Sequence, residues 1–273
     1  MRFGAVNWKI RPCGHESDFL DHAFELLDLA ASKSCEWVVF PELLTLELLG
    51  MAPESERSDI LKWIQPGILE PIFDRARHHG ITLVAGSTFV QTERGTENVS
   101  IVRNPLKQES RQSKIVLTQF EIDDWSLTPG SGLQATTDER VGVTICYDSE
   151  FPESGRKLAN AGVLVQCVPA FTETEHGFWR VRHCCQARAV ENQVYVIHAS
   201  LVGSLGSEPV PEAVGSSAIL APSVDPFPAT GVLAETPWNV EEIAVADLDF
   251  EKLDWARNHG DVRNFQDRNR GDW

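Results

Sequence analysis

The sequence predicts an α/β protein whose strands form a mixed sheet or two stacked sheets. Apolar runs alternate with segments of helical periodicity through most of the 273 residues, a pattern typical of α/β folds. Several neighbouring apolar runs are separated only by a polar turn, which indicates hairpins within one sheet. Hydrophobic residues make up 42% of the chain, enough to bury a sizeable core.

Each element follows from the spacing of its apolar residues. Phe19, Ala23 and Leu27 recur at helical spacing, whereas continuous runs such as WVVF are typical of buried strands. Along the first half of the chain we expect, in order, a strand at 2–10, a helix at 15–32, a strand at 36–40, a turn-like segment at 41–50, a helix at 66–79, a strand at 81–90 and its hairpin partner at 98–104.

The order of strand and helix repeats after residue 140. We expect a strand at 140–146, a helix at 153–161, a strand at 163–168, a helix at 176–191, strands at 193–199, 216–221, 231–235 and 241–248, a short helix at 249–257 and a polar tail. Strand signals resume soon after each proline-rich stretch, so these stretches are predicted to be loops. We therefore expect residues 1–273 to form a single domain.

Charge and cysteine usage narrow the class of protein. The formal net charge is -16 and no basic stripe offsets it, which argues against a nucleic-acid partner. No apolar run approaches the roughly 20 residues that cross a bilayer, and the first residues do not resemble a signal peptide. The six cysteines form no C-x-x-C pair, so we expect a reducing, cytoplasmic location and no metal or other cofactor.

The stretch VGVTICYDSEFPES, residues 141–154, is the most informative in the chain. An apolar strand ends at Cys146 and is followed at once by Tyr147, Asp148 and Glu150. A cysteine at such a junction is either a small core residue or a nucleophile at the edge of a sheet. We expect backbone N–H groups near the turn to lower its pKa and to stabilise an oxyanion.

A thiol nucleophile needs a base and a cationic partner. Glu42 follows an apolar strand and a proline, which places its carboxylate where open α/β sheets hold their sites. Its other interpretation is an acid at a helix N-terminus. Lys114 heads an apolar segment and does not lie in a charge run, although an isolated lysine is usually a solvated surface residue.

Two other readings of the reactive residues are weaker. A Cys–His enzyme would need His176, His183 or His198 beside Cys146, which a sequence alone does not exclude. The run HCC at 183–185 suggests zinc, but three adjacent helical residues point in different directions.

Taken together, the motifs resemble the nitrilase superfamily of carbon–nitrogen hydrolases, specifically its amidase-like branches. The resemblance covers nearly the whole chain and rests on FPE at 40–42, AGSTF at 85–89, CYDSEFPE at 146–153, RKLANAGVLV at 156–165 and ARAVENQVYVIHAS at 187–200. It implies a four-layer αββα sandwich of two mixed sheets.

The resemblance also implies the roles of the site residues. Glu42, Lys114 and Cys146 would form a Glu-Lys-Cys triad, and Glu121 would match a second glutamate that orders the site. The oxyanion and substrate pocket would include Tyr147 and Phe171.

The acids that follow the cysteine receive their own expectations. Asp148 is expected to serve as a turn and helix-capping group, and Glu153 to be structural, either tethering the turn or pairing with an arginine such as Arg188. The family often has a basic or apolar residue where this chain has Glu150. If Glu150 reaches the pocket rim it would disfavour carboxylate-bearing substrates, whereas the alternative is a solvated or salt-bridged residue.

These expectations predict a hydrolase that cleaves a non-peptide C–N bond of a small amide or N-carbamoyl compound through a cysteine thioester. The Tyr-Asp step after the cysteine favours an amide over a nitrile, because nitrilases of this superfamily typically have Trp-Glu there. A nitrilase, or a catalytically inactive binding or scaffold protein on the same fold, is the alternative. We expect a homodimer or larger homo-oligomer, with Phe178, Trp179 and Val181 as an apolar patch.

Overall fold

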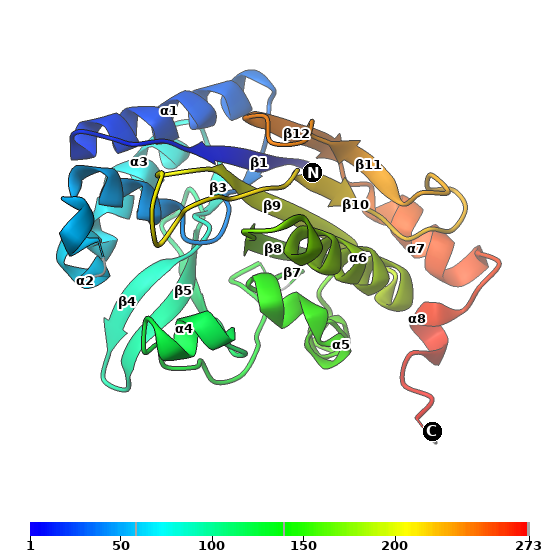
Figure 1. Ribbon diagram of the computed structural model, residues 1–273. Helices are drawn as coiled ribbons and strands as arrows, with labels where there is room; N and C mark the ends of the chain where they lie inside the picture. Colours follow the sequence, from blue (N-terminus) through cyan, green and yellow to red (C-terminus); the bar gives the residue numbers. More distant parts are fainter. Residues whose placement is uncertain (58, 139, 272–273) are drawn as a thin grey trace.

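The computed structural model describes residues 1–57, 59–138 and 140–271 of the chain (Figure 1). Its strands are β1 (Arg2–Ile10), β2 (Trp37–Val39), β3 (Thr82–Val84), β4 (Thr88–Thr92), β5 (Gly95–Arg103), β6 (Glu109–Ser113), β7 (Val141–Val143), β8 (Val165–Phe171), β9 (Tyr195–Gly203), β10 (Ala218–Leu220), β11 (Val232–Glu235) and β12 (Glu242–Asp247). Its α-helices are α1 (Glu16–Ser32), α2 (Ile60–Trp63), α3 (Leu69–His78), α4 (Gln119–Asp123), α5 (Pro152–Asn160), α6 (Glu175–Asn192), α7 (Phe250–His259) and α8 (Asn264–Asp267). Short 3-10 helices are η1 (Leu44–Met51), η2 (Glu54–Glu56), η3 (Pro66–Ile68) and η4 (Cys146–Glu150).

The strands form two mixed sheets that meet at β1. In the first sheet β1 pairs antiparallel with β12 and parallel with β2, and the sheet continues through β3 to the antiparallel strands β5, β4 and β6. In the second, β7, β8 and β9 are parallel and are followed by the antiparallel strands β10 and β11. The last residues of β1 pair with β9, so the two sheets share one hydrogen-bonded network.

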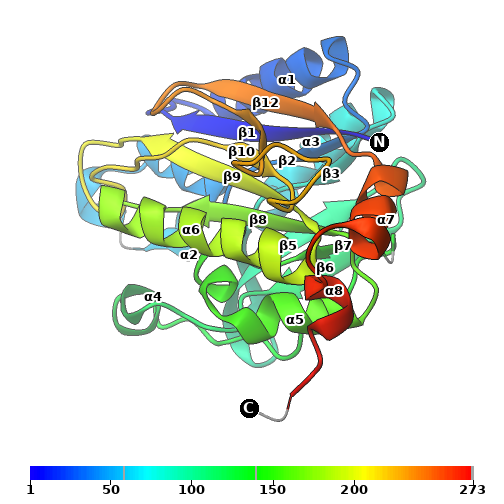
Figure 2. The ribbon, with the colours of Figure 1, turned by 90° about the vertical axis from the view of Figure 1, so that its right-hand side faces the viewer.

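Helices cover the outer face of each sheet. Alternate residues of β1 point to opposite faces, so Val6 and Trp8 pack in the cluster that contains the apolar face of α1, whereas Phe3 belongs to the other core cluster with Val143 and Cys167. Helix α3 shares the cluster of α1, and α5 and α6 lie on the far side of β8 and β9 (Figure 2). The resulting α-β-β-α layering confirms the predicted sandwich.

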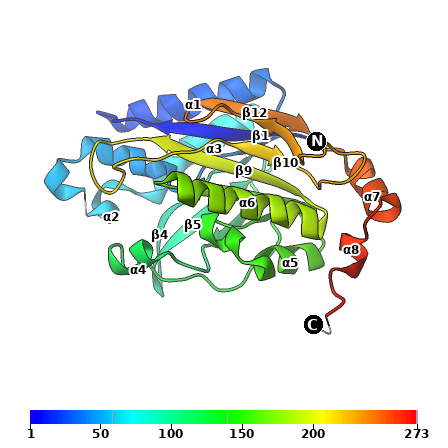
Figure 3. The ribbon, with the colours of Figure 1, turned by 45° about the vertical axis from the view of Figure 1, so that its right-hand side comes forward.

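The C-terminal elements run along one end of the sandwich. Helix α7 begins close to the N-terminus, and α8 follows it toward the C-terminus (Figure 3). There Met1 and Leu248 exchange backbone hydrogen bonds, from the Leu248 N–H at 2.8 Å and from the Met1 amino group at 3.3 Å. In the described ranges, no helix is long and apolar enough to cross a membrane.

Several predicted boundaries were wrong for identifiable reasons. The expected strand at 81–90 divides into β3 and β4 at Gly86, where φ is +59° and a Cβ atom would lie 1.8 Å from the Pro41 carbonyl oxygen. Both halves pair with β5, so the hairpin prediction held for β4. The expected strand at 140–146 ends at Val143. The polar strand β6 and the short helices α4 and α8 were not predicted, and the turn-like segment at 41–50 is largely η1.

The apolar patch predicted on the long helix was wrong in composition. Phe178 and Val181 are buried, and only Trp179 of the three is exposed, at 47%. Its indole stacks on that of Trp238, with ring centroids 6.5 Å apart.

Candidate active site

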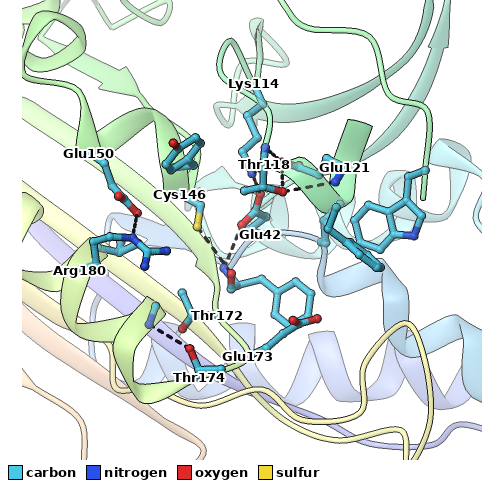
Figure 4. A pocket seen from close by; sticks show the side chains of 17 residues that line it. Glu42, Lys114, Thr118, Glu121, Cys146, Glu150, Thr172, Glu173, Thr174 and Arg180 are labelled. Carbon is cyan, nitrogen blue, oxygen red and sulfur yellow. Dashed lines mark hydrogen bonds and ion pairs between the residues drawn. The ribbon is translucent and has the colours of Figure 1, made fainter. Parts of the chain in front are cut away.

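The sheets bring the predicted reactive residues to one pocket of about 220 Å³ (Figure 4). Glu42 follows β2, Lys114 follows β6, Cys146 follows β7 and Phe171 is the last residue of β8. Because these strands end at a common edge, side chains far apart in the sequence meet there. The pocket is lined by Glu42, Leu43, Lys114, Thr118, Phe120, Glu121, Trp125, Cys146, Tyr147, Glu150, Phe171, Thr172, Glu173, Thr174, Gly177, Arg180 and Val181.

Lys114 lies between two buried carboxylates. Its Nζ atom is 2.8 Å from Glu42 Oε1 and 2.8 Å from Glu121 Oε2. Glu121 is placed by a capping box at the start of α4, in which its Oε2 atom accepts hydrogen bonds from the N–H and Oγ1 of Thr118 at 2.9 and 3.0 Å. The ammonium group therefore neutralises one of two negative charges that would otherwise be buried together.

Asn98, on β5, forms a second bridge between the same carboxylates. Its Nδ2 atom donates to Glu42 Oε1 at 2.9 Å and to Glu121 Oε1 at 3.0 Å. The other oxygen of Glu42 accepts the backbone N–H of Phe171 at 3.0 Å. Both carboxylates are thus held by donors on two sides.

Cys146 begins η4 with a φ of +45°, which is the left-handed region. A non-glycine residue there costs about 1–3 kcal/mol and persists only where the surroundings enforce it. Here the Ser149 hydroxyl donates to the Cys146 carbonyl at 2.6 Å, and the Cys146 thiol donates to the Phe171 carbonyl at 3.6 Å. The turn aims the sulfur into the pocket beside Glu42.

Burial and charge set the proton positions. Burial, followed by the Glu42 charge, raises the pKa of the Cys146 thiol well above its ordinary value, and Lys114 opposes this only in part. The expected lowering of this pKa by backbone N–H groups was therefore wrong. The resting thiol is protonated and needs a base.

The pKa values of Lys114 and of the two carboxylates beside it do not all shift in the same direction. Burial raises the pKa of Glu42 more strongly than Lys114 lowers it. Burial acts in the same sense on Glu121, but Lys114 and the hydrogen bonds from Thr118 and Asn98 outweigh it and lower the pKa. The two carboxylates raise the pKa of Lys114 despite its burial, so it stays protonated. Glu42 is thus the carboxylate better suited to accept a proton.

Asp148 lies in the turn after Cys146, as expected, but it caps neither η4 nor α5, so the capping part of the expectation was wrong. Its carboxylate accepts the backbone N–H groups of Ile115, at 3.1 and 3.2 Å, and of Val116, at 2.7 Å. Burial raises the pKa of Asp148 to about 6, although these hydrogen bonds oppose the rise. Asp148 therefore ties the turn after Cys146 to the segment that follows Lys114.

Arg188 has a different partner from the one predicted. It forms an ion pair with Glu191, not with Glu153, which is exposed. Its guanidinium also donates to the carbonyl of Ser149 at 3.0 Å and to that of Glu150 at 3.4 Å. Arg188 thus supports the turn that carries Cys146.

The remaining pocket residues form its walls and rim. The Glu150 carboxylate is 2.8 Å from Arg180 Nε, which agrees with the salt-bridged interpretation of this acid. Tyr147 and Phe171 both line the pocket, as does Arg180 on α6, which the sequence did not point to. Figure 4 shows the Glu150–Arg180 pair and Glu173 on different sides of the cysteine.

The histidines of the alternative readings lie elsewhere. His198 is buried against Arg182 and Ser200, and burial lowers its pKa well below the ordinary value. His176 and His183 are not among the residues that line the pocket. Within the ranges that the structure describes, no group of three or more His, Cys, Asp or Glu side chains is arranged to hold a metal ion.

Comparison with known proteins identifies the family. The model of the carbon-nitrogen hydrolase family matches residues 5–258. The probable hydrolase YhcX of Bacillus subtilis is 30% identical over 99% of this chain and 54% of its own length. An (R)-stereoselective amidase from Pseudomonas sp is 30% identical over 82% of this chain and 77% of its own. The chain belongs to the carbon-nitrogen hydrolase family, a family of enzymes, and it spans about half the length of YhcX.

Solved structures agree on the fold. The chain is similar to Nit3 of Saccharomyces cerevisiae, a member of branch 10 of the nitrilase superfamily, with a TM-score of 0.76 and 24% identity over 94% of this chain and 93% of Nit3. It is also similar to the C. elegans NitFhit protein, with a TM-score of 0.76 and 20% identity over 94% of this chain and 63% of NitFhit. The family model and the similarity to YhcX confirm the resemblance to the carbon–nitrogen hydrolases of the nitrilase superfamily.

Proposed function

We propose that the chain hydrolyses a small amide or N-carbamoyl compound through a thioester on Cys146. The observation that carries this proposal is the meeting of a buried thiol, a carboxylate with a raised pKa and an ammonium group in one pocket. Similarity to amidases supports it, including the (R)-stereoselective amidase and an omega-amidase of Xenopus laevis. A nitrilase of Pyrococcus abyssi is also similar, at 29% identity, so the bond cleaved needs a direct test.

The first step forms a bond from Cys146 Sγ to the carbonyl carbon while Glu42 takes the thiol proton. Glu42 Oε1 already accepts two hydrogen bonds and Oε2 only one, so the lone pair left on Oε2 is the better acceptor. The carbonyl oxygen becomes an oxyanion that faces Lys114 Nζ and the backbone N–H of Tyr147.

The second step breaks the C–N bond. Glu42 returns its proton to the departing nitrogen, which leaves as ammonia or an amine, and the oxyanion collapses to a thioester on Cys146. Glu42 then takes a proton from a water molecule that attacks the thioester, and this proton restores the thiol as the acid leaves. Glu121, held by Thr118, keeps its charge throughout and balances Lys114.

The test is a panel of small amides, N-carbamoyl compounds and nitriles assayed for ammonia release, with the acyl-enzyme trapped and weighed by mass spectrometry. Turnover of an amide with a mass adduct on Cys146 supports the proposal. Conversion of nitriles alone would make the chain a nitrilase, and no adduct with any compound would favour a binding or scaffold protein.

We further propose that residues 1–273 act as one catalytic unit that pairs into homodimers in a reducing, cytoplasmic compartment. The six cysteines are free, which fits such a compartment. The exposed, stacked indoles of Trp179 and Trp238 offer an apolar surface for the second subunit. Sedimentation as a monomer at micromolar concentration would contradict the homodimer. An unchanged dimer in Trp179→Ser would contradict the assignment of this surface as its interface.

A further inference from the structure

Asn98 is buried in β5 and touches both carboxylates of the site without being one of the reacting groups. Its Nδ2 atom has two hydrogens, and the two acceptors are Glu42 Oε1 at 2.9 Å and Glu121 Oε1 at 3.0 Å. Lys114 makes the same two connections from its ammonium group. The four side chains therefore form a closed ring in which two donors alternate with two acceptors.

The backbone of Asn98 fixes this ring in place. Its carbonyl oxygen accepts the N–H of Lys114 at 2.8 Å, and Asn98 pairs with Phe89 across β4 and β5. The residue that bridges the two carboxylates thus also holds the main chain of the lysine between them. A shift of Asn98 would move Lys114 with it.

The side-chain oxygen of Asn98 makes the orientation of the amide unambiguous. Asn98 is fully buried, and among the described residues its Oδ1 atom has no hydrogen-bond partner. Turning the amide over would satisfy no donor and would bring Oδ1 against the oxygens of Glu42 and Glu121. A buried oxygen without a partner carries a free-energy cost. The two contacts made by Nδ2 account for an amide at this position.

We propose that Asn98 is a positioning residue that decides where the thiol proton goes. Its hydrogen bond occupies Oε1 of Glu42 together with that of Lys114, which leaves Oε2 for the proton. Because the bond goes to the ionised carboxylate, it also lowers the pKa of Glu42 and keeps it a base at lower pH. This inference rests on the proposed function, in which Glu42 accepts that proton.

The test is Asn98→Leu, which removes the two N–H donors of the side chain and roughly keeps its volume. We expect kcat/KM on the best amide of the panel to fall about 10- to 100-fold, the usual loss for a hydrogen bond to a charged group. The acid limb of the pH profile of kcat/KM should move to higher pH by about one unit, because Glu42 loses a donor. A purely structural role would lower the amount of active protein without moving that limb.

Ser100→Ala is the matched control. Ser100 lies two residues further along β5, is fully buried, and its hydroxyl also has no partner among the described residues. Ser100→Ala should leave the pH profile of kcat/KM unchanged. If Asn98→Leu does not fold, Asn98→Ser keeps one donor and should give a smaller shift in the same direction. An unmoved acid limb in either folded variant, or kcat/KM within twofold of the parent chain, would overturn the inference.

A substrate-free measurement separates this inference from the proposed function. The rate at which iodoacetamide alkylates Cys146, followed on the Cys146 peptide by mass spectrometry, depends on loss of the thiol proton. Its pH dependence should move with Asn98→Leu and not with Ser100→Ala. That result upholds the inference even if no amide is hydrolysed, whereas amide turnover with no shift in alkylation overturns it and leaves the proposed function standing.

Discussion

Glu42 and Glu121 share a single ammonium group, each with one carboxylate oxygen 2.8 Å from Lys114 Nζ. The two acids nevertheless differ in their environments. Glu121 Oε2 also accepts two hydrogen bonds from Thr118, and the pKa of Glu121 is lowered, whereas burial raises the pKa of Glu42. This difference suits the proposed mechanism, in which Glu121 is the permanent negative charge and Glu42 is the exchangeable proton site.

Removal of the ammonium group should therefore damage both stability and activity. Lys114→Ala leaves two buried carboxylates unpaired, and breaking a buried ion pair in this way costs about 3–5 kcal/mol of unfolding free energy. Glu42→Gln should cost less stability because it removes a charge and leaves Lys114 paired with Glu121. Urea unfolding of the two variants measures the difference. Equal stabilities would argue that Lys114 is not the counter-ion of both acids.

The losses of activity in Lys114→Ala and Glu42→Gln should be similar, although their losses of stability differ. Lys114→Ala and Glu42→Gln should each lower kcat by about three orders of magnitude or more, and combining Glu42→Gln with Cys146→Ala should lower it no further than Cys146→Ala alone. Single-turnover kinetics on the best amide provides the measurement. Additive losses would show that the two residues act in separate steps.

Cys146→Ala should abolish turnover and leave the fold intact, because the removed thiol forms no ion pair. The matched control is Cys184→Ala on α6, since Cys184 is half-buried and does not line the pocket. Near-parental turnover is expected for the control. Iodoacetamide labelling of the Cys146 peptide should stop only in Cys146→Ala, and more than a trace of hydrolysis by that variant would refute the thioester mechanism.

The pattern of apolar residues predicted the layers of the fold because alternation along a strand and helical spacing are local properties. It missed β6, whose sequence ESRQS is polar and which is a strand because it pairs with β5. It also missed the break at Gly86, where the backbone turns with a positive φ and passes too close to Pro41, a residue distant in sequence, for a side chain to fit. Elements defined by long-range contacts leave little trace in local composition.

The residues of the candidate site also divide into those that local sequence could predict and those that it could not. Glu42, Lys114 and Cys146 could be singled out from residue type and strand position, and T-x-x-E at 118–121 is a capping-box signature that could have placed Glu121 at the start of α4. The contact of Asp148 with the segment after Lys114 could not be predicted, because it joins parts of the chain 32 and 33 residues apart. Arg180 was missed because nothing local distinguishes it from other helical arginines.

A buried histidine predicts a loss of stability at alkaline pH. His22 Nδ1 lies 2.8 Å from Glu47 Oε1 and Nε2 lies 2.7 Å from Glu241 Oε2, and a ring that donates to both oxygens carries a proton on each nitrogen. Burial lowers the pKa of His22, but the hydrogen bonds that its ring donates to Glu241 and Glu47 outweigh burial and raise the pKa above the ordinary 6.5. The contribution of protonated His22 to the unfolding free energy is complete below about pH 6.5 and is lost as pH rises through the folded-state pKa of His22.

This prediction is tested by measuring the unfolding free energy of His22→Gln and of the parent chain as a function of pH. Unfolding free energy of the parent should decline as pH rises above about 6.5, and His22→Gln should be less stable at low pH and lack that decline. Exposed His183→Gln is the control and should follow the parent. A parental curve that is flat through this range would mean that the histidine is neutral in the folded state.

The charge of the pocket rim predicts a preference among substrates. Glu150 forms an ion pair with Arg180, whereas Glu173 forms no ion pair with any described residue, so an ionised Glu173 adds an uncompensated negative charge to the rim. A carboxylate on the substrate would meet repulsion from this charge and an ammonium group would not. We expect kcat/KM for a neutral amide or its amino derivative to exceed that of the matching dicarboxylic monoamide by roughly fivefold, since one charge contact near water is worth about 1 kcal/mol.

Three substrates of equal length test this preference: pentanamide, 5-aminopentanamide and the monoamide of glutaric acid. Glu173→Gln should narrow the difference between them, and Glu175→Gln, which removes a neighbouring exposed acid outside the pocket, should not. Added salt should also narrow it, because the rim is open to solvent. Faster turnover of the glutaric monoamide than of pentanamide would show instead that Arg180 binds the substrate carboxylate and that the rim selects acidic amides.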